Sequence, residues 1–351
     1  MKILTNRTRT HRKLNVIFCG TPDFCLPTLE LLLNHPHINL SHIITPESKP
    51  VGRGRKITLP AVAQFAIDNN IPLFQTENIN KEEKFLSDLN LISDEKNYEK
   101  DHERNRPDII LVLAFCQFLS QKILDLPRIG AFNIHASILP KLRGAAPIQH
   151  AILKGEKSSG ISIQKMVKKM DAGDVVQKDE IEISESEIGG QLFTRLKFLA
   201  ALSTNSFLQK ILNNNLTFEK QDETKVTFAP CLQREYGHIN FLKDDFETIN
   251  KKVRALDPWP GTYCFLNGKR LKIFEIEPIT MNVNLKPGEV KKDLGGLVVG
   301  VMPSNKSESE IKSKSESKIK AVRLSKIQLE GKKCCCDVEL LHGLREEITL
   351  T

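Results

Sequence analysis

The stretch PDIILVLAF, Pro107 to Phe115, decides the fold class of this 351-residue chain. It is a short, continuous apolar run, and a second run of the same kind, IGAFNIHAS (Ile129 to Ser137), follows it along the chain. Continuous apolar runs of this length are typical of strands that are buried on both faces of a parallel sheet. We therefore predict two buried strands of one sheet here.

Apolar runs upstream alternate with segments of helical spacing. Strand-like runs are LNVIFCG (14–20), NLSHIIT (39–45) and IPLFQ (71–75), and helix-like runs are FCLPTLELLL (24–33) and LPAVAQFAIDNN (59–70). Thr21 and Pro22 are predicted to be the N-cap and the first residue of a helix. Strands that alternate with helices indicate βαβ units, so residues 14–212 are predicted to form an α/β domain with a Rossmann-like, open, mostly parallel sheet.

The character of the sequence changes after residue 212. We interpret residues 213–224 as a linker and residues 225–351 as a small all-β domain, an OB-like barrel, because several short strands need closure to hide their edges. Strand-like runs there include VTFAP, GTYCFLNGKRLKIFEI, LVVGVM and AVRLSKIQL. Within them, LNGK (Leu266 to Lys269) is typical of a hairpin turn.

Three segments have compositions that do not suit a packed core. Residues 1–13 are basic and lack both acids and an apolar h-region, which predicts a flexible N-terminus rather than a secretory signal. Residues 81–106 are dense in charge and are predicted to form a solvated insertion. The Ser- and Lys-rich residues 303–320 are predicted to form a disordered loop, because low-complexity polar sequence cannot bury apolar surface.

Composition excludes several classes of protein. No apolar run approaches the roughly 18 residues that a membrane span needs. The eight cysteines contain no CxxC pair, and three of them are adjacent at Cys334 to Cys336, where strand geometry would point them to opposite faces. We therefore predict that the chain holds no metal and works in a reducing compartment. We expect a bacterial-type cytoplasmic protein, with an organelle as the alternative, and a monomer. The net charge of +8 permits a polyanionic partner.

Polar residues interrupt the second apolar run where its strand should end. Asn133 and His135 are two residues apart, so on a strand their side chains point to the same face. In open α/β sheets, ligands bind beyond the carboxyl ends of central strands. An amide beside an imidazole combines a donor for a developing oxyanion with a group that exchanges protons. Asp171 is the best candidate for a carboxylate that orients the imidazole, and Asp174 is the second.

The pattern alone leaves a structural interpretation open. A histidine at a strand end is more often a hydrogen-bonding structural residue than a catalyst. Likewise, the segment LRGAAPIQHAIL from Leu142 is also typical of a loop that enters a helix.

Several motifs resemble those of one known family. NIHASILPKLRGAAPIQHAI resembles the Asn-x-His and Ser-Leu-Leu-Pro signature of the formyltetrahydrofolate-dependent formyltransferases. FCGTPDFCLPTL, KPVGRGRKITLPAVAQFA, MDAGDVV, RALDPWPGTY and IQLEGKK are similar to the branch that acts on methionyl-tRNA, in the same order. The resemblance covers nearly the whole chain except the basic start, the charged insertion and the Ser/Lys loop.

The resemblance implies an activity and a set of site residues. The activity is transfer of a formyl group from 10-formyltetrahydrofolate to the α-amino group of methionine on initiator tRNA, without a metal. The catalytic residues of the family match Asn133, His135 and Asp171. Those implied to bind folate are Ser137, Ile138, Leu139 and Pro140, together with Leu113, Phe115 and Cys116 at the end of the preceding strand.

Two further features follow from the resemblance. Cys116 replaces a glycine of the family beside the expected pterin site, so backbone contacts there are expected to shift.

On the tRNA side, the segment KPVGRGRK (49–56) is either a solvated loop or a loop that enters the acceptor stem. The residues implied to bind tRNA are Arg53, Arg55, Lys56, Lys141 and Arg143, with the C-terminal barrel on the backbone of the stem.

Three rival functions remain open at this point. A glycinamide ribonucleotide formyltransferase would carry a phosphate-binding Gly-rich loop, which the segment from Gly20 to Asp23 lacks. A sugar-nucleotide formyltransferase would have a different second domain. A non-catalytic RNA-binding protein would have no reason to keep Asn133, His135 and Asp171 together.

Overall fold

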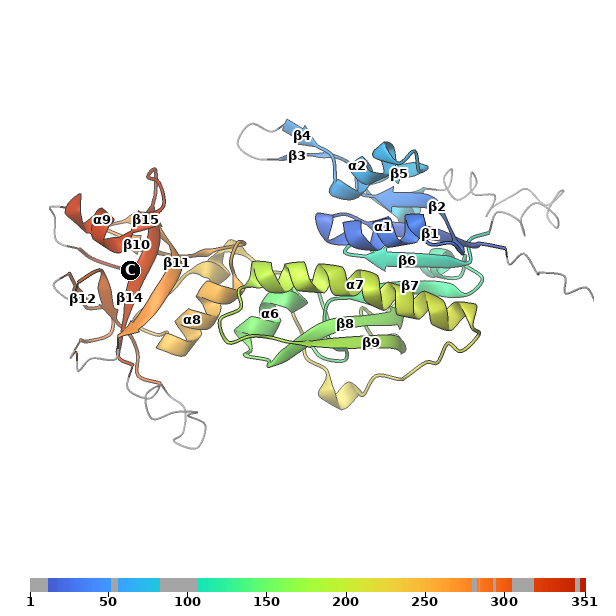
Figure 1. The fold of residues 1–351 in the computed structure, drawn as a ribbon. Helices are drawn as coiled ribbons and strands as arrows, with labels where there is room; N and C mark the ends of the chain where they lie inside the picture. Colours follow the sequence, from blue (N-terminus) through green and yellow to red (C-terminus); the bar gives the residue numbers. More distant parts are fainter. Residues whose placement is uncertain are drawn as a thin grey trace, which may run out of the picture. The chain divides into compact units, whose positions relative to one another are not determined.

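The structure is a computed structural model that describes residues 12–51, 56–82, 106–279, 283, 285–292, 295–304, 319–344 and 348–351 (Figure 1). The predicted flexible N-terminus, the charged insertion and the Ser/Lys loop fall almost wholly outside these residues. The chain forms two compact units. The first comprises the residues up to Gly144, Gly160–Ile181 and Phe193–Phe228, and the second comprises Ala145–Ser159, Glu182–Leu192 and Ala229–Thr351.

A seven-stranded sheet forms the centre of the first unit, in the order β5-β2-β1-β6-β7-β8-β9. Its strands are β1 (Leu14–Gly20), β2 (Ile38–Thr45), β5 (Leu73–Gln75), β6 (Ile109–Leu113), β7 (Gly130–His135), β8 (Ser158–Lys165) and β9 (Val175–Glu182). The pairs from β5 through to β7 are parallel, and β7 pairs with β8 in antiparallel fashion. The predicted mostly parallel α/β sheet is confirmed.

The order of the strands reverses direction between β1 and β6. From β1 the chain first builds β2 and β5 on one side and then returns to build β6 and β7 on the other side. In open α/β sheets, ligands bind beyond the carboxyl ends of the strands at such a point. The ends of β1, β6 and β7 therefore mark the edge of the sheet where a site is expected.

Helices connect the strands, and a small hairpin follows β2. The helices of three turns or fewer are α1 (Leu26–Asn34), α2 (Ala61–Asp68), α5 (Gln121–Leu124) and α6 (Pro147–Leu153), and α7 (Gly189–Leu212) is the long one. Of these, α6 and the start of α7 belong to the second unit. The strands β3 (Lys49–Val51) and β4 (Lys56–Thr58) form a separate antiparallel pair.

The predicted N-cap at Thr21 is wrong. A 3₁₀ turn, Asp23–Cys25, precedes α1, and the extended residue Pro22 is the N-cap of that turn. The hydroxyl of Thr21 instead donates to the carbonyl oxygen of Phe115 at 3.4 Å, and so joins the ends of β1 and β6.

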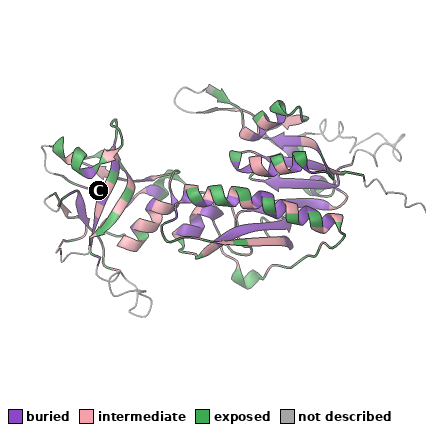
Figure 2. Cartoon of the chain, viewed as in Figure 1, coloured by how far each residue is buried: buried purple, intermediate pink, exposed green. Residues whose placement is uncertain are grey.

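The core of the first unit lies on both faces of the sheet. The strand β6 is buried along its whole length, and β1 and β7 are buried along most of theirs, as the largely purple ribbons show (Figure 2). One apolar cluster joins Ile17, Ile44, Ile110 and Val112 to Phe115 and to Ile123 of α5. Burial on both faces explains why these strands read as continuous apolar runs rather than as alternating ones.

The second unit contains a small antiparallel sheet, in the order β10-β11-β14-β13-β12, with β15 beside β14. Its strands are β10 (Thr262–Leu266), β11 (Lys269–Ile279), β12 (Val290–Lys291), β13 (Val298–Gly300), β14 (Ala321–Leu329) and β15 (Cys335–Cys336). The predicted hairpin is confirmed: Asn267 and Gly268 between β10 and β11 both have positive φ, 47° and 77°, as a tight two-residue turn requires.

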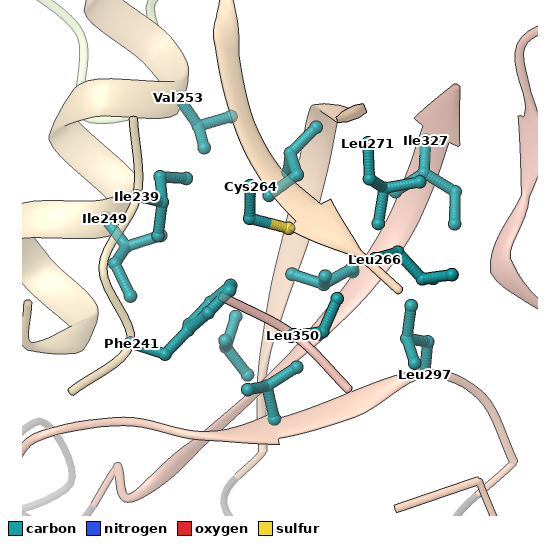
Figure 3. Packing of buried hydrophobic residues seen from close by; sticks show 14 of the residues in the cluster. Ile239, Phe241, Ile249, Val253, Cys264, Leu266, Leu271, Leu297, Ile327 and Leu350 are labelled. Carbon is teal, nitrogen blue, oxygen red and sulfur yellow. The ribbon is translucent and has the colours of Figure 1, made fainter. Parts of the chain in front are cut away.

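Two helices that the sequence analysis did not predict also belong to this second unit. They are α8 (Phe246–Ala255) and α9 (Asp337–His342). Asp245 caps α8, because its carboxylate accepts from the backbone N–H of Thr248 at 2.9 Å. Ile249 and Val253 of α8 pack with Cys264, Leu266 and other strand residues in the core of this unit (Figure 3). In the described part of the chain, no helix has both the length and the apolar character of a membrane span.

Candidate functional site

Three polar side chains meet at the carboxyl end of β7. Asn133 and His135 lie in the last three residues of that strand, which ends at His135. The carboxylate of Asp171 reaches both of them. Its Oδ1 accepts from Asn133 Nδ2 at 3.3 Å, and its Oδ2 lies 3.4 Å from His135 Nε2. The geometry therefore brings together the amide, the imidazole and the carboxylate that the sequence analysis selected from separate segments.

Both ring nitrogens of His135 face oxygen acceptors. Nδ1 lies 2.9 Å from the hydroxyl of Ser137, and that hydroxyl donates its own hydrogen to the carbonyl oxygen of Lys141 at 2.7 Å. Nε2 lies 3.1 Å from the carbonyl oxygen of Gly144, in addition to the Asp171 carboxylate. Since carbonyl and carboxylate oxygens cannot donate, this arrangement suits an imidazolium with a hydrogen on each nitrogen.

The Asp171 carboxylate is largely buried but has several donors. Burial raises its pKa, whereas hydrogen bonds from His135, from the N–H of Gly144 and from Gln164, with the charge of His135, lower it. The net result is a pKa below the ordinary value of a carboxyl group. Asp171 is therefore held as a carboxylate. The second candidate, Asp174, contributes its carbonyl oxygen to the N–H of Lys165 at 2.9 Å.

The residues expected to bind folate differ in their exposure and in their existing hydrogen bonds. Leu113, Phe115 and Leu139 are each at most 2 % exposed, backbone included, so each presents almost no surface to a ligand. The N–H of Leu139 already donates to the hydroxyl of Ser162 at 3.0 Å. Ser137 is also buried, and its hydroxyl is engaged by His135 and Lys141. Ile138 and Pro140 are partly exposed.

The strand β6 ends in an unusual backbone conformation. Ala114 and Cys116 have φ of 48° and 62°, in the left-handed region, and both side chains are exposed. A glycine enters this region without steric conflict, whereas a residue with a Cβ is strained by roughly 1 kcal/mol. The cysteine thus occupies a position where the backbone favours glycine.

Replacing Cys116 with glycine is expected to stabilise the first unit. The relief of strain is partly offset by the larger entropy of glycine in the unfolded chain, which leaves a net gain on the order of 0.5 kcal/mol. Urea unfolding monitored on the full chain measures this gain. Cys116→Ala is the matched control, since it removes the thiol and keeps the Cβ. Equal stability of the glycine and alanine variants would contradict the backbone argument.

The residues expected to bind tRNA are distributed unevenly. Arg53 and Arg55 lie outside the described residues, and Lys56 opens β4 with its side chain also undescribed. Lys141 is exposed beside the polar cluster, next in sequence to Pro140.

Arg143 does not fit the tRNA contact predicted for it. Its side chain is only 1 % exposed, and its guanidinium donates to the side chains of Gln221 and Glu223 at 2.8 and 2.7 Å. A guanidinium buried in this way has no open face for a phosphate group. The sequence indicated a cation near the site but could not indicate that its partners lie about 80 residues away.

Gln164 belongs to the site although the sequence analysis did not select it. It is directly opposite Asn133 in the β7–β8 register, and its amide donates to Asp171 Oδ1 at 3.1 Å. The signal was present in GISIQK, where alternation places Ser162 and Gln164 on one face and Ile161 and Ile163 on the other. In the described ranges, no group of three or more His, Cys, Asp and Glu side chains is placed to hold a metal ion.

Comparisons with known proteins agree with this geometry. Residues 12–204 match the model of the formyl transferase family, and residues 232–345 match that of the formyl transferase C-terminal domain. The chain is 36 % identical over 285 residues to the methionyl-tRNA formyltransferase of Bacillus velezensis, an alignment that covers 81 % of this chain and 85 % of the relative.

Solved structures share the fold at low identity. WlaRD, a sugar 3N-formyl transferase crystallised in the presence of dTDP and 5-N-formyl-THF, aligns with a TM-score of 0.58 and 16 % identity over 92 % of this chain and all of that one. HypX from Aquifex aeolicus, in complex with tetrahydrofolic acid, aligns with a TM-score of 0.55 and 14 % identity. That alignment covers 95 % of this chain but 47 % of HypX, so the chain spans about half of its length. On the two family models and the relative from Bacillus velezensis, the chain belongs to the methionyl-tRNA formyltransferase family.

Proposed function

We propose that this chain transfers the formyl group of 10-formyltetrahydrofolate to the α-amino group of methionyl-tRNA at the cluster of Asn133, His135 and Asp171. The observation that carries the proposal is the contact of one carboxylate with both the amide and the imidazole at the carboxyl end of β7. Membership of the methionyl-tRNA formyltransferase family supports the choice of both substrates.

The donor set of the cluster fits a formyl amide. When bound, 10-formyltetrahydrofolate supplies the formyl carbon on its N10 nitrogen. Asn133 Nδ2 carries two hydrogens and directs one of them at Asp171 Oδ1. The other serves as a donor to the formyl oxygen as negative charge develops there. One such donor contributes about 3 kcal/mol in comparable sites.

His135 moves the proton that the reaction must transfer between nitrogens. The imidazolium, whose Nε2–H faces Asp171 and the carbonyl oxygen of Gly144, gives that proton to the departing N10 nitrogen. The neutral ring next accepts the proton that the attacking amine releases and so returns to its starting form. The carboxylate of Asp171 lies 3.4 Å from Nε2 and fixes the orientation of the ring.

On the tRNA side, Lys141 is the described cation best placed to contact the acceptor end. It is exposed, and its carbonyl oxygen accepts the hydrogen bond from Ser137, the residue that contacts His135. A lysine contact to phosphate adds affinity that weakens with salt. Arg53, Arg55 and Lys56 stay a prediction for the same role, as do the folate contacts of Ile138, Pro140 and Cys116.

A substrate panel tests the proposed function. The chain is incubated with 10-formyltetrahydrofolate and, separately, methionyl initiator tRNA, glycinamide ribonucleotide or an amino-sugar nucleotide. We expect formylation of the charged tRNA alone, measured as formylmethionine released from the tRNA. Uncharged tRNA is the control, because it lacks the α-amine. Faster formylation of the sugar nucleotide or of the ribonucleotide would reject the proposal in favour of that rival.

The predicted monomer and the predicted cytoplasmic location also stay proposals. All eight cysteines are free thiols in the structure, which is compatible with a reducing compartment. Size-exclusion chromatography with light scattering measures the mass of the particle in solution.

A further inference from the structure

The loop that presents Asp171 is fastened by a side chain from a distant segment, Gln221. The amide nitrogen of Gln221 donates to the carbonyl oxygens of Asp171 and Gly173 at 2.8 and 2.7 Å, and lies 3.1 Å from Gln164 Oε1. Asp171 itself has φ of 50°, a left-handed conformation that a residue other than glycine adopts at a cost of roughly 1 kcal/mol. Interactions outside the loop must therefore hold it in this form.

Gln164 fastens the same loop from the sheet. Its Nε2 donates to Asp171 Oδ1 at 3.1 Å, while its Oε1 accepts from the N–H of Gly173 at 3.1 Å. The side chain is 2 % exposed and stands on the rigid strand β8 opposite Asn133. The β7–β8 strand pair therefore positions both the amide of Asn133 and the carboxylate of Asp171. Gly173 permits this close approach, because a Cβ there would overlap the carbonyl oxygen of Lys165.

Arg143 fixes which way the amide of Gln221 points. Its Nε and Nη2 donate to Gln221 Oε1 at 3.1 and 2.8 Å, so the oxygen must face Arg143 and the NH₂ group must face the loop. Glu223 holds the same guanidinium at 2.7 Å, and the next residue after Arg143, Gly144, donates its N–H to Asp171 Oδ2 at 2.9 Å. The buried arginine is therefore part of the support of the site.

We propose that Gln221 and Gln164 are positioning residues, which hold the Asp171 loop so that its carboxylate meets Asn133 and His135. The proposal rests on the proposed function in one respect, namely that Asp171 acts in formyl transfer. It assigns to Arg143 the role of orienting Gln221. Neither glutamine needs to touch a substrate for this role.

The decisive variant is Gln221→Glu. Glutamate has the same shape and keeps an acceptor for Arg143, but it replaces the NH₂ group with an oxygen that faces two carbonyl oxygens. We expect kcat to fall roughly 10- to 100-fold, because small misplacement of a catalytic group has effects of this size. The KM values for folate and tRNA should change less than about twofold, since the loss affects the transition state rather than substrate binding. Gln209→Glu, on the exposed face of α7, is the matched control.

A second readout is independent of turnover. Carbon-13 NMR of labelled aspartate follows the titration of the Asp171 carboxyl, whose pKa is lowered by His135 and then by the hydrogen bonds from Gly144 and Gln164. In Gln221→Met and in Gln164→Met, which keep the length of the side chain but have neither a donor nor a new charge, the midpoint should move up toward the ordinary value. Thermal unfolding of the same samples shows whether each variant is folded.

The outcomes separate the two proposals. An unchanged kcat and an unchanged Asp171 titration in both folded variants would overturn the positioning role, even where Asp171→Asn abolishes turnover. A loss of activity that appears only as a raised KM would also overturn it. Full activity of Asp171→Asn would instead reject the proposed function, while a shifted titration in Gln221→Met would still support the positioning of the loop.

Discussion

His135→Ala is expected to lower kcat roughly 1,000-fold or more, with the KM for both substrates changed only slightly. The variant removes the group that exchanges the proton between the two nitrogens, an effect that ranges from about 10² to 10⁴ for positioned acids and bases. It also removes the ring that faces Asp171 at 3.4 Å. Single-turnover formylation of methionyl-tRNA with saturating folate isolates the chemical step from product release.

Controls distinguish loss of chemistry from loss of structure. His37→Ala changes an exposed histidine of the same unit and should keep full turnover. Ser137→Ala keeps the ring but removes the acceptor at Nδ1, so it should fall between the parent and His135→Ala. A His135→Ala enzyme that is folded and turns over within about threefold of the parent would remove His135 from the mechanism.

The elements that were predictable share a local cause. The strand β7 and its polar end could be predicted because side chains alternate along a strand, and the ends of central strands in α/β sheets carry ligands. The hairpin could be predicted because Asn and Gly both adopt the positive φ that its two-residue turn requires. The helix α8 was missed although its signals were present: Asp245 is an N-cap residue, and Ile249 and Val253 have helical spacing.

The features that were not predictable depend on contacts between distant segments. Arg143 looked like a cation for tRNA because charge is visible in sequence and burial is not. Its partners, Gln221 and Glu223, lie in a polar stretch with no periodic pattern. The left-handed conformation at Asp171 was equally hidden, since aspartate has no strong preference for it and the loop is held by side-chain contacts from elsewhere.

Asp171→Asn is expected to lower kcat roughly 1,000-fold although it changes a single atom. Every group directed at the carboxylate is a donor: Asn133 and Gln164 on Oδ1, and the N–H of Gly144 with His135 on Oδ2. An asparagine must turn its NH₂ group toward one of these two pairs. Whichever way the amide points, its NH₂ group then faces two other donors and no acceptor. The negative charge that faces the His135 ring at 3.4 Å is lost as well.

The pH dependence of stability gives an independent test of the same substitution. The pKa of Asp171 is lowered in the folded state, so its carboxylate contributes stability that is present above the unfolded pKa of about 3.9. This contribution is lost as the pH falls through the lower, folded pKa. Asp171→Asn should therefore be less stable than the parent at neutral pH, and the difference between the two should shrink steadily below about pH 4.

Urea unfolding at a series of pH values measures that difference. Asp125→Asn is a suitable control, because Asp125 is exposed at the end of α5 and contacts Gln121 rather than the cluster. A stability difference between Asp171→Asn and the parent that is the same at pH 7 and pH 3 would contradict the ionised, donor-bound carboxylate. Activity lost together with a pH-dependent loss of stability would place both effects in the contacts that the carboxylate makes with Asn133, His135, Gly144 and Gln164.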